Sequence, residues 1–137
     1  EGKTEHNLFY IVFDTLLVRG KGADMVFKEC SVRPGEAKSG LVGHLPLEKR
    51  RQLMHSIVTP LTRRVEFVKS RVVPEGRKKE RSDALFTEFE KAIERGEEGL
   101  VVKDLTTPYV VGEKSRSKAY WIKMKPEYSD QGLLSHF

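Results

Sequence analysis

The densest cluster of apolar positions lies near the beginning of the chain, at residues 8–18. This run is rich in β-branched and aromatic residues, and it is apolar at both odd and even positions until Asp14 interrupts it. Successive side chains of a strand point to opposite faces, so an apolar run without alternation is typical of a strand that is covered on both sides. We therefore expect a buried strand over residues 8–18, followed by a glycine-containing turn at residues 19–22.

Two later segments have the period of an amphipathic helix. Pro46 is a residue type favoured in the first turn of a helix, and apolar residues follow it with helical spacing at positions 53, 54, 57 and 58, which predicts a helix over residues 46–58. A second helix is expected to begin at Ser82 or Asp83, either of which can cap it, and to end at Gly96. Its apolar face comprises Leu85, Phe86, Phe89, Ala92 and Ile93.

The remaining apolar stretches are short and lie between turns. Residues 20–44 contain five glycines and Pro34 without a sustained period, so we expect a long surface loop there, with one short strand near residues 25–27. The basic stretch 77–81 is also expected to be a loop. Strands joined by short turns, with only two helices, predict an α+β fold of antiparallel sheets with flanking helices. The predicted strands are residues 65–69, 72–73, 99–102, 109–112 and 119–125.

Composition and charge narrow the class of protein. The 137 residues are 38% hydrophobic and 33% charged, which is typical of one globular domain or part of a larger one. The formal net charge of +5 favours a polyanionic partner without establishing one. The lone Cys30 excludes an internal disulfide and indicates a reducing, intracellular setting, and the run at residues 8–18 is too short to span a bilayer, so no membrane partner is expected. The chain begins without Met, which is expected of a fragment but also of a mature or trimmed protein.

Charged residues flank two of the predicted strands. Lys123 and Lys125 are two residues apart, so in a strand they share a face with their roots about 6 to 7 Å apart, and both ammonium groups can reach one phosphate. Glu98 and Lys103 bracket an apolar stretch; strict alternation places them on opposite faces, so Glu98 must lie at the strand entrance or at a bulge. A carboxylate such as Glu98 is a hard oxygen ligand that suits Mg²⁺ together with a substrate phosphate.

A solvated face of an antiparallel sheet is the alternative for these lysines. Against it, six cations fall within 23 residues beside only two acidic residues, Asp104 and Glu113. The phosphate-binding loops of P-loop and Rossmann proteins and the nucleophile motif G-x-S-x-G do not occur in the sequence. The six cations are Lys103, Lys114, Arg116, Lys118, Lys123 and Lys125.

Three segments resemble motifs of one enzyme family. Residues 98–103, Glu-Gly-Leu-Val-Val-Lys, resemble the E-G-h-h-h-K motif of the covalent nucleotidyltransferases, where h is a hydrophobic residue. Residues 121–128, Trp-Ile-Lys-Met-Lys-Pro-Glu-Tyr, resemble the W-h-K-h-K-x-x-Y segment of ATP-dependent DNA ligases, and residues 10–14, Tyr-Ile-Val-Phe-Asp, resemble the Y-x-x-F-D strand of the same family. The order of the motifs also fits, and residues 126–130 are most similar to the eukaryotic DNA ligase IV branch.

The resemblance implies a domain and a site. The domain is the C-terminal half of a ligase adenylation domain, a partial ATP-grasp-like nucleotidyltransferase fold, over residues 1–130, with residues 20–44 as an inserted loop and residues 131–137 as a tail. Phe13 would stack on the adenine of ATP, with an ordinary core residue as the alternative. Glu98 would bind Mg²⁺ or its waters, and Trp121 would only pack. The catalytic cations that contact the phosphates of ATP and of the adenylate would be Lys103, Lys123 and Lys125, sharing one cleft with Glu98 and Phe13.

Ligases of this family join DNA breaks through an enzyme-adenylate and a DNA-adenylate. The implied partners are nicked or broken double-stranded DNA, the N-terminal half of the ligase domain, an oligonucleotide-binding domain and a repair scaffold protein, with a role in nonhomologous end joining in the nucleus. The family's nucleophilic lysine lies in a K-x-D-G motif that is not among these 137 residues, so the chain alone is expected to be inactive. Two alternatives stay open: an RNA ligase or messenger-RNA capping nucleotidyltransferase, and a non-catalytic basic module that binds DNA or a protein partner.

Overall fold

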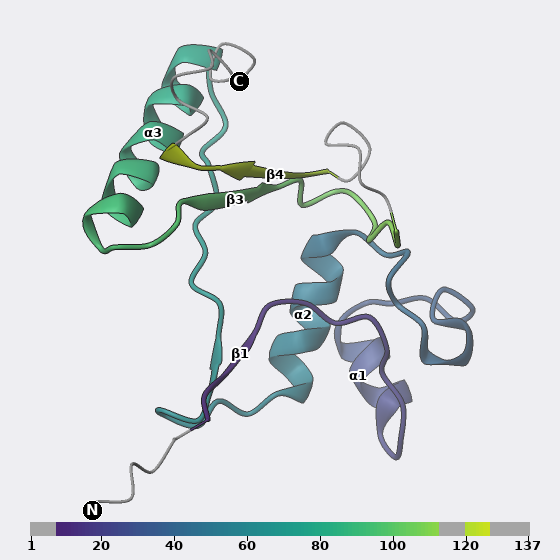
Figure 1. Cartoon of the computed structure of the whole chain (residues 1–137). Helices are drawn as coiled ribbons and strands as arrows, with labels where there is room; N and C mark the ends of the chain where they lie inside the picture. The colour runs from purple at the N-terminus through teal and green to yellow at the C-terminus, as the bar shows by residue number, and fades with distance from the viewer. Residues whose placement is uncertain (1–7, 113–119, 127–137) are drawn as a thin grey trace, which may run out of the picture. The chain divides into compact units, whose positions relative to one another are not determined.

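The computed structural model describes residues 8–112 and 120–126, which form two compact units (Figure 1). The first unit comprises residues 8–69 and 105–112, and the second comprises residues 70–104 and 120–126. In the first unit the elements are β1 (Tyr10–Val12), α1 (Ala23–Glu29), the 3₁₀ helix η1 (Lys38–Gly40), α2 (Leu47–Ile57) and β2 (Val65–Phe67). In the second unit they are α3 (Lys78–Glu94), β3 (Leu100–Lys103) and β4 (Trp121–Met124).

A buried ion pair lies at the centre of the first unit. Arg50 on α2 is fully buried, and its Nε and Nη2 donate to the two carboxylate oxygens of Asp14 at 2.8 and 2.9 Å. Its Nη1 donates to the carbonyl oxygens of Leu45 and Thr107 at 2.6 and 3.2 Å. A guanidinium forms this fork with a carboxylate in a fixed geometry. Asp14 therefore interrupts the apolar run because it neutralises a buried cation.

The segment that was predicted to be a long surface loop contributes to the core of the first unit. The predicted short strand near residues 25–27 was also wrong, because these residues belong to the helix α1. Val26 and Phe27 of α1 pack against the buried cluster, and the chain after α1 places more buried side chains in it. The short length of α1 explains the error, since seven residues give too few helical repeats to reveal a period. The cluster comprises Val18, Cys30, Val32, Val42, Leu45 and Leu53.

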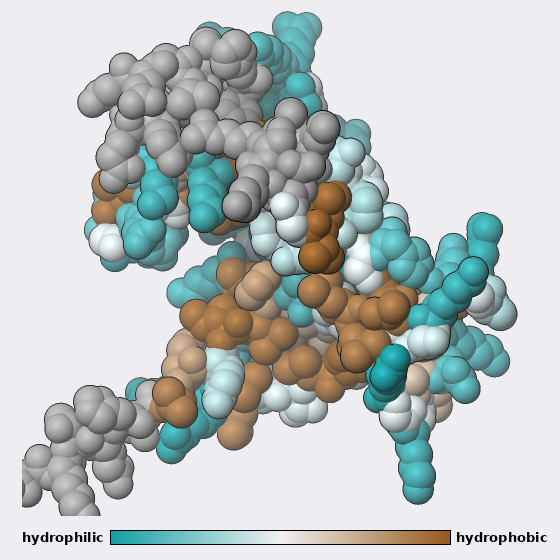
Figure 2. Space-filling view, turned by 45° about the vertical axis from the view of Figure 1, so that its right-hand side comes forward, coloured by the Kyte–Doolittle hydropathy of each residue, from teal (hydrophilic) through white to brown (hydrophobic). Residues whose placement is uncertain are grey.

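The apolar run at residues 8–18 is more exposed than predicted. Only Tyr10–Val12 forms a strand, and it pairs in parallel with β2, so that Tyr10 lies opposite Val65. Tyr10 is 63% exposed, so the expectation of a strand buried on both faces was wrong for the part of the chain that the structure describes. The exposed apolar residues of this unit include Leu8, Tyr10, Ile11, Leu17 and Leu41. Apolar side chains gather over a broad area of the molecular surface (Figure 2).

The second unit packs one helix against a two-stranded antiparallel sheet. In α3, Ala92 is fully buried, and the helix contacts β3. The helix ends at Gly96, as predicted, and Gly96 has a φ of 74°. The N–H of Gly96 donates to the carbonyl of Ile93, and the N–H of Glu97 donates to the carbonyl of Ala92. This is the Schellman arrangement that a glycine favours.

The start of α3 was predicted four or five residues too late. The helix begins at Lys78, so the basic stretch 77–81 is its first turn and not a loop. The reason is local: Glu80 accepts a hydrogen bond from the N–H of Arg77 at 3.1 Å, so that this glutamate satisfies a free donor at the helix start. Ser82 and Asp83 lie inside the helix.

The mixed fold with an antiparallel sheet and helices is confirmed, as is the helix after Pro46. The predicted strands at residues 65–69, 99–102 and 119–125 appear in shortened or shifted form as β2, β3 and β4. Residues 72–73 and 109–112 form no strand, and the N–H of Tyr109 donates to the carbonyl of Gly43 instead. None of the helices in the described ranges is long and apolar enough to cross a membrane.

We expect Arg50→Met to lower the free energy of unfolding of the chain by about 3–5 kcal/mol, because it leaves the carboxylate of Asp14 without its charged partner inside the protein. Arg64→Met is the matched control, since Arg64 is exposed and its loss should change stability by less than about 0.5 kcal/mol. Urea titration followed by circular dichroism measures both. Equal stability of the two variants would contradict the structural role of the pair.

Candidate functional site

The two faces of the β3–β4 sheet differ in chemistry. Directly opposed residues of an antiparallel pair share a face, which groups Val101 with Lys123 and Lys103 with Trp121. This face is open: Lys123 is exposed and Val101 is 50% exposed. The opposite face carries the pairs Leu100–Met124 and Val102–Ile122, and Met124 on it is buried. The sheet thus presents lysines to solvent on one side only, as the alternation of residues 122–125 predicts.

Gly99 sets the position of the predicted carboxylate. Its φ of 131° is a conformation that L side chains rarely adopt, and a Cβ at this position would overlap the carbonyl oxygen of Met124. The backbone therefore turns just before β3, and Glu98 lies at the strand entrance, one of the two places that the sequence allowed. Its Oε2 lies 3.2 Å from the Nζ of Lys125.

The Glu98–Lys125 ion pair is easily opened. The side chain of Glu98 is 90% exposed, and an ion pair in such a position contributes at most about 1 kcal/mol. A phosphate can therefore replace the carboxylate beside Lys125, and the carboxylate can turn to a cation, without a large loss of stability. In the described ranges, no three His, Cys, Asp or Glu side chains are grouped so that they could hold a metal ion.

Trp121 has a contact that the sequence did not indicate. The Nζ of Lys103 lies 3.6 Å from the centroid of the Trp121 ring, which is the geometry of a cation–π interaction. Trp121 was expected only to pack, but its ring also fixes the ammonium group of Lys103 on the open face. The contact depends on the register that places Lys103 opposite Trp121, and this register comes from the pairing of β3 with β4, so no local signal in the sequence indicates it.

The five predicted site residues divide between the two units. In the second unit, Lys103 and Lys123 lie on the open face of β3–β4, and Lys125 directly follows β4. Glu98, directly before Gly99 at the entrance of β3, pairs with Lys125. Phe13 belongs to the first unit, directly after β1, and is 48% exposed, so it is not an ordinary core residue. The single cleft that would unite all five stays a prediction. Lys114, Arg116, Lys118 and residues 127–130 lie outside the described residues.

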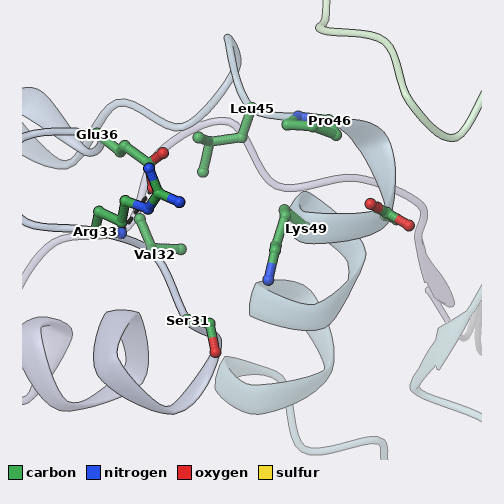
Figure 3. A pocket seen from close by; sticks show the side chains of 8 residues that line it. Ser31, Val32, Arg33, Glu36, Leu45, Pro46 and Lys49 are labelled. Atoms are coloured by element: carbon green, nitrogen blue, oxygen red, sulfur yellow. Dashed lines mark hydrogen bonds between the residues drawn. The ribbon is translucent and has the colours of Figure 1, made fainter.

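A separate pocket lies in the first unit, between the segment that was expected to be a loop and the start of the predicted helix at residues 46–58 (Figure 3). It has a volume of about 360 Å³ and is bordered by the chain after α1 and by the start of α2. Lys49 in its wall donates to the carbonyl of Cys30 at 3.1 Å, and Glu36 accepts from the N–H of Arg33 at 2.7 Å. Two cations and two anions line the pocket, so it has no net preference for either charge. The lining residues are Ser31, Val32, Arg33, Glu36, Leu45, Pro46, Glu48 and Lys49.

We expect Gly99→Ala to destabilise the chain more than Gly96→Ala. Both glycines have positive φ, but only at Gly99 does an added Cβ meet backbone, whereas the space around Gly96 is open. An alanine near the left-handed region at Gly96 costs about 1 kcal/mol. At Gly99, the φ of 131° lies farther from that region, and the clash with backbone adds to the strain, so the excess loss measures how firmly the turn before Glu98 is held. Urea denaturation of both variants checks this. Equal losses would show that the turn before β3 can relax.

Comparison with known proteins agrees with these motifs. Residues 1–125 match the family model described as ATP dependent DNA ligase domain. The chain is 32% identical to human DNA ligase 4 over 119 residues, which is 87% of this chain and 10% of that protein, and 31% identical to DNA ligase 4 of Saccharomyces cerevisiae over 122 residues, 89% of this chain and 10% of that protein. An archaeal DNA ligase, from Methanothermobacter thermautotrophicus, is 38% identical over 85 residues, 62% of this chain and 14% of that protein.

The chain thus spans about a tenth of the length of the DNA ligase 4 proteins that it matches. No solved structure is significantly similar to it. The family match covers both structural units, including β1, β3 and β4, which carry the predicted site residues. The chain belongs to the ATP-dependent DNA ligase domain family.

Proposed function

We propose that the chain is the phosphate-handling part of the adenylation domain of an ATP-dependent DNA ligase. The observation that supports this most is the pair of lysines on the open face of β3–β4, Lys103 and Lys123, together with Lys125 just after β4, which pairs with a carboxylate positioned by a glycine that no other residue can replace without strain. A solvated sheet face has no need of such a turn. Family membership supports the same conclusion.

In this proposal the lysines stabilise charge that develops during adenylyl transfer. When the α-phosphate of ATP is attacked, negative charge grows on its oxygens, and a preorganised cation is worth about 3 kcal/mol in the barrier. Lys123 on the open face of β4 and Lys125 directly after β4 would contact the phosphates. Lys103, held against Trp121, would contact the phosphates or the adenylate from the neighbouring strand. Phe13 would stack on the adenine of ATP.

Mg²⁺ fits this site in a limited way. Glu98 offers one exposed carboxylate, and Mg²⁺ often takes only one or two protein carboxylates and draws its other ligands from water and substrate phosphates. When bound, Mg²⁺ would neutralise phosphate charge beside Glu98. For Glu98 to bind it, the ion pair with Lys125 must open, which frees the ammonium group for the phosphate at the same time.

The whole ligase would use further parts. The K-x-D-G lysine that forms the enzyme-adenylate is not among these 137 residues, so we infer that another segment supplies it. Relatives named DNA ligase 4 support DNA as the substrate. We further propose, from the resemblance of the motifs, that the substrate is nicked or broken duplex DNA and that the protein acts in nonhomologous end joining in the nucleus. An oligonucleotide-binding domain and a repair scaffold protein would be its partners. The missing motif also keeps a second candidate, a non-catalytic basic module that binds DNA.

Transfer of labelled AMP separates the two candidates. We would replace the matching segment of human DNA ligase 4 with residues 1–130 and measure labelling of the chimera by α-³²P ATP with Mg²⁺. The folded chimera should become labelled, and Lys123→Ala or Lys125→Ala should reduce the rate at least about 100-fold, because each removes a cation from the phosphate. Lys28→Ala, an exposed lysine of α1, is the matched control and should leave labelling unchanged.

Two results would contradict the proposal. If both site variants are labelled at the rate of the Lys28→Ala control, the lysines do not handle the phosphates. If the chimera has native-like circular dichroism and takes up no label, the chain does not complete an adenylation domain, and the non-catalytic module becomes the better interpretation.

A further inference from the structure

The one tryptophan of the chain lies on the open face of the β3–β4 sheet. Trp121 shares this face with Lys103, which is directly opposite, and with the exposed residues Val101 and Lys123. The buried residue of β4, Met124, lies on the other face, and Trp121 is only partly buried. Packing in the core around Met124 therefore does not account for a large aromatic side chain at position 121.

The ring of Trp121 has a charged partner on the open face. The Nζ of Lys103 lies 3.6 Å from the centroid of the ring. The face of an aromatic ring is the negative side of its quadrupole, so it attracts an ammonium group, and indole attracts it more strongly than the rings of Phe and Tyr. The two residues are directly opposed in the register of β3 and β4, so the backbone sets the distance between the roots of their side chains. The sheet itself therefore builds this contact.

An aromatic partner holds a lysine without neutralising it. A lysine has a long, flexible side chain and loses rotamer freedom when its ammonium group must stay at one point. A carboxylate also holds an ammonium group, as Glu98 holds that of Lys125, but it cancels the positive charge. The ring of Trp121 has no net charge, so this contact leaves the charge of Lys103 in place. An ammonium group has three N–H donors, so contact with a ring on one side does not prevent it from binding oxygen atoms on another.

The two contacts that hold lysines of the proposed nucleotide site differ in their exposure to water. Lys125 pairs with Glu98, whose side chain is 90% exposed, so water and salt weaken this pair. Lys103 and Trp121 are both partly buried, and a cation–π contact is stronger where water is excluded. The contact of Lys103 with the ring is therefore the more persistent of the two.

We propose that Trp121 is a positioning residue of the nucleotide site, whose ring holds the ammonium group of Lys103 at the open face of the sheet before a phosphate binds there. This role rests on the proposed function, which assigns Lys103 to the phosphates or the adenylate. Trp121 itself does not touch the reacting atoms. Its effect on the reaction depends on the presence of Lys103, and this dependence distinguishes positioning from packing.

Nuclear magnetic resonance of the full chain tests the contact without any reaction. Protons above the face of an aromatic ring resonate upfield, so the ε-methylene protons of Lys103 should lie upfield of those of Lys28, an exposed lysine of α1. Trp121→Leu should abolish this shift, and Trp121→Phe should keep part of it. The spectrum of Lys103→Met assigns the resonance, because the signal of Lys103 is missing from it.

AMP labelling of the ligase 4 chimera tests the role in the reaction. Trp121→Leu should lower the labelling rate about 5- to 30-fold, which is the range that one cation–π contact supplies. Trp121→Phe keeps a ring face, so its loss should be less than about threefold. In the Lys103→Met background, Trp121→Leu should cause no further loss, because the group that the ring positions is already absent.

Ile122→Ala is the matched control. Ile122 is the next residue of β4 and lies on the opposite face, so its truncation removes packing from the same strand and leaves the contact between Lys103 and Trp121 intact. Its effect on the labelling rate should be the same with and without Lys103. Urea titration followed by circular dichroism selects the variants that are folded under the conditions of labelling.

Several results would overturn this proposal. If the unaltered chain shows no upfield shift, the contact does not form. If Trp121→Leu lowers the rate equally with and without Lys103, as is expected of Ile122→Ala, the ring only packs. Labelling that depends on Lys123 and Lys125 but not on Trp121 would remove the role of Trp121 alone. A folded chimera that takes up no label would remove the proposed function and this role with it, while the upfield shift would still show the contact.

Discussion

The first unit depends on one buried charge. Arg50 lies inside the protein with no exposed surface, and a guanidinium in that position is tolerated only if its donors are satisfied. Asp14 neutralises it, and the carbonyls of Leu45 and Thr107 accept its remaining hydrogen bonds, so that one side chain joins α2 to segments 36 and 57 residues away in sequence. The N–H groups of Leu47 and Glu48, at the start of α2, donate to the carbonyls of Thr107 and Leu105, which ties the same returning segment to the helix.

The second unit uses its charges in the opposite way. Its lysines and Glu98 lie at the surface, where water weakens their mutual attraction and where they remain available to a ligand. What fixes them is backbone and aromatic geometry: the turn at Gly99 positions Glu98, and the ring of Trp121 positions Lys103. A buried and paired charge stabilises the fold. A charge that its neighbours hold at the surface can exchange one partner for another, and a residue that binds a phosphate must be able to do so.

The errors of sequence reasoning have a common physical cause. The helix at residues 46–58 and the end of α3 were predictable because several turns of periodicity and a glycine stop are local signals. α1 was missed because seven residues do not establish a period, and its stability comes from packing of Val26 and Phe27 on the core. The start of α3 was missed because a glutamate reaching back to Arg77, not Ser82 or Asp83, provides the cap. The parallel pairing of β1 with β2 joins residues 55 apart and has no local sign.

The sequence by itself determined the family, the alternation that sends Lys123 to the open face of the sheet, and the need for Glu98 to leave the regular strand, because motif order and side-chain alternation are properties of the chain alone. Tertiary structure decided which of the charged residues became structural. Asp14 stands beside Phe13 in the same motif, yet it faces a buried arginine 36 positions later, while Phe13 stays half-exposed. Only the folded structure shows which charged residue is structural, because the free-energy cost of burying a charge depends on partners that folding brings from distant positions in the sequence.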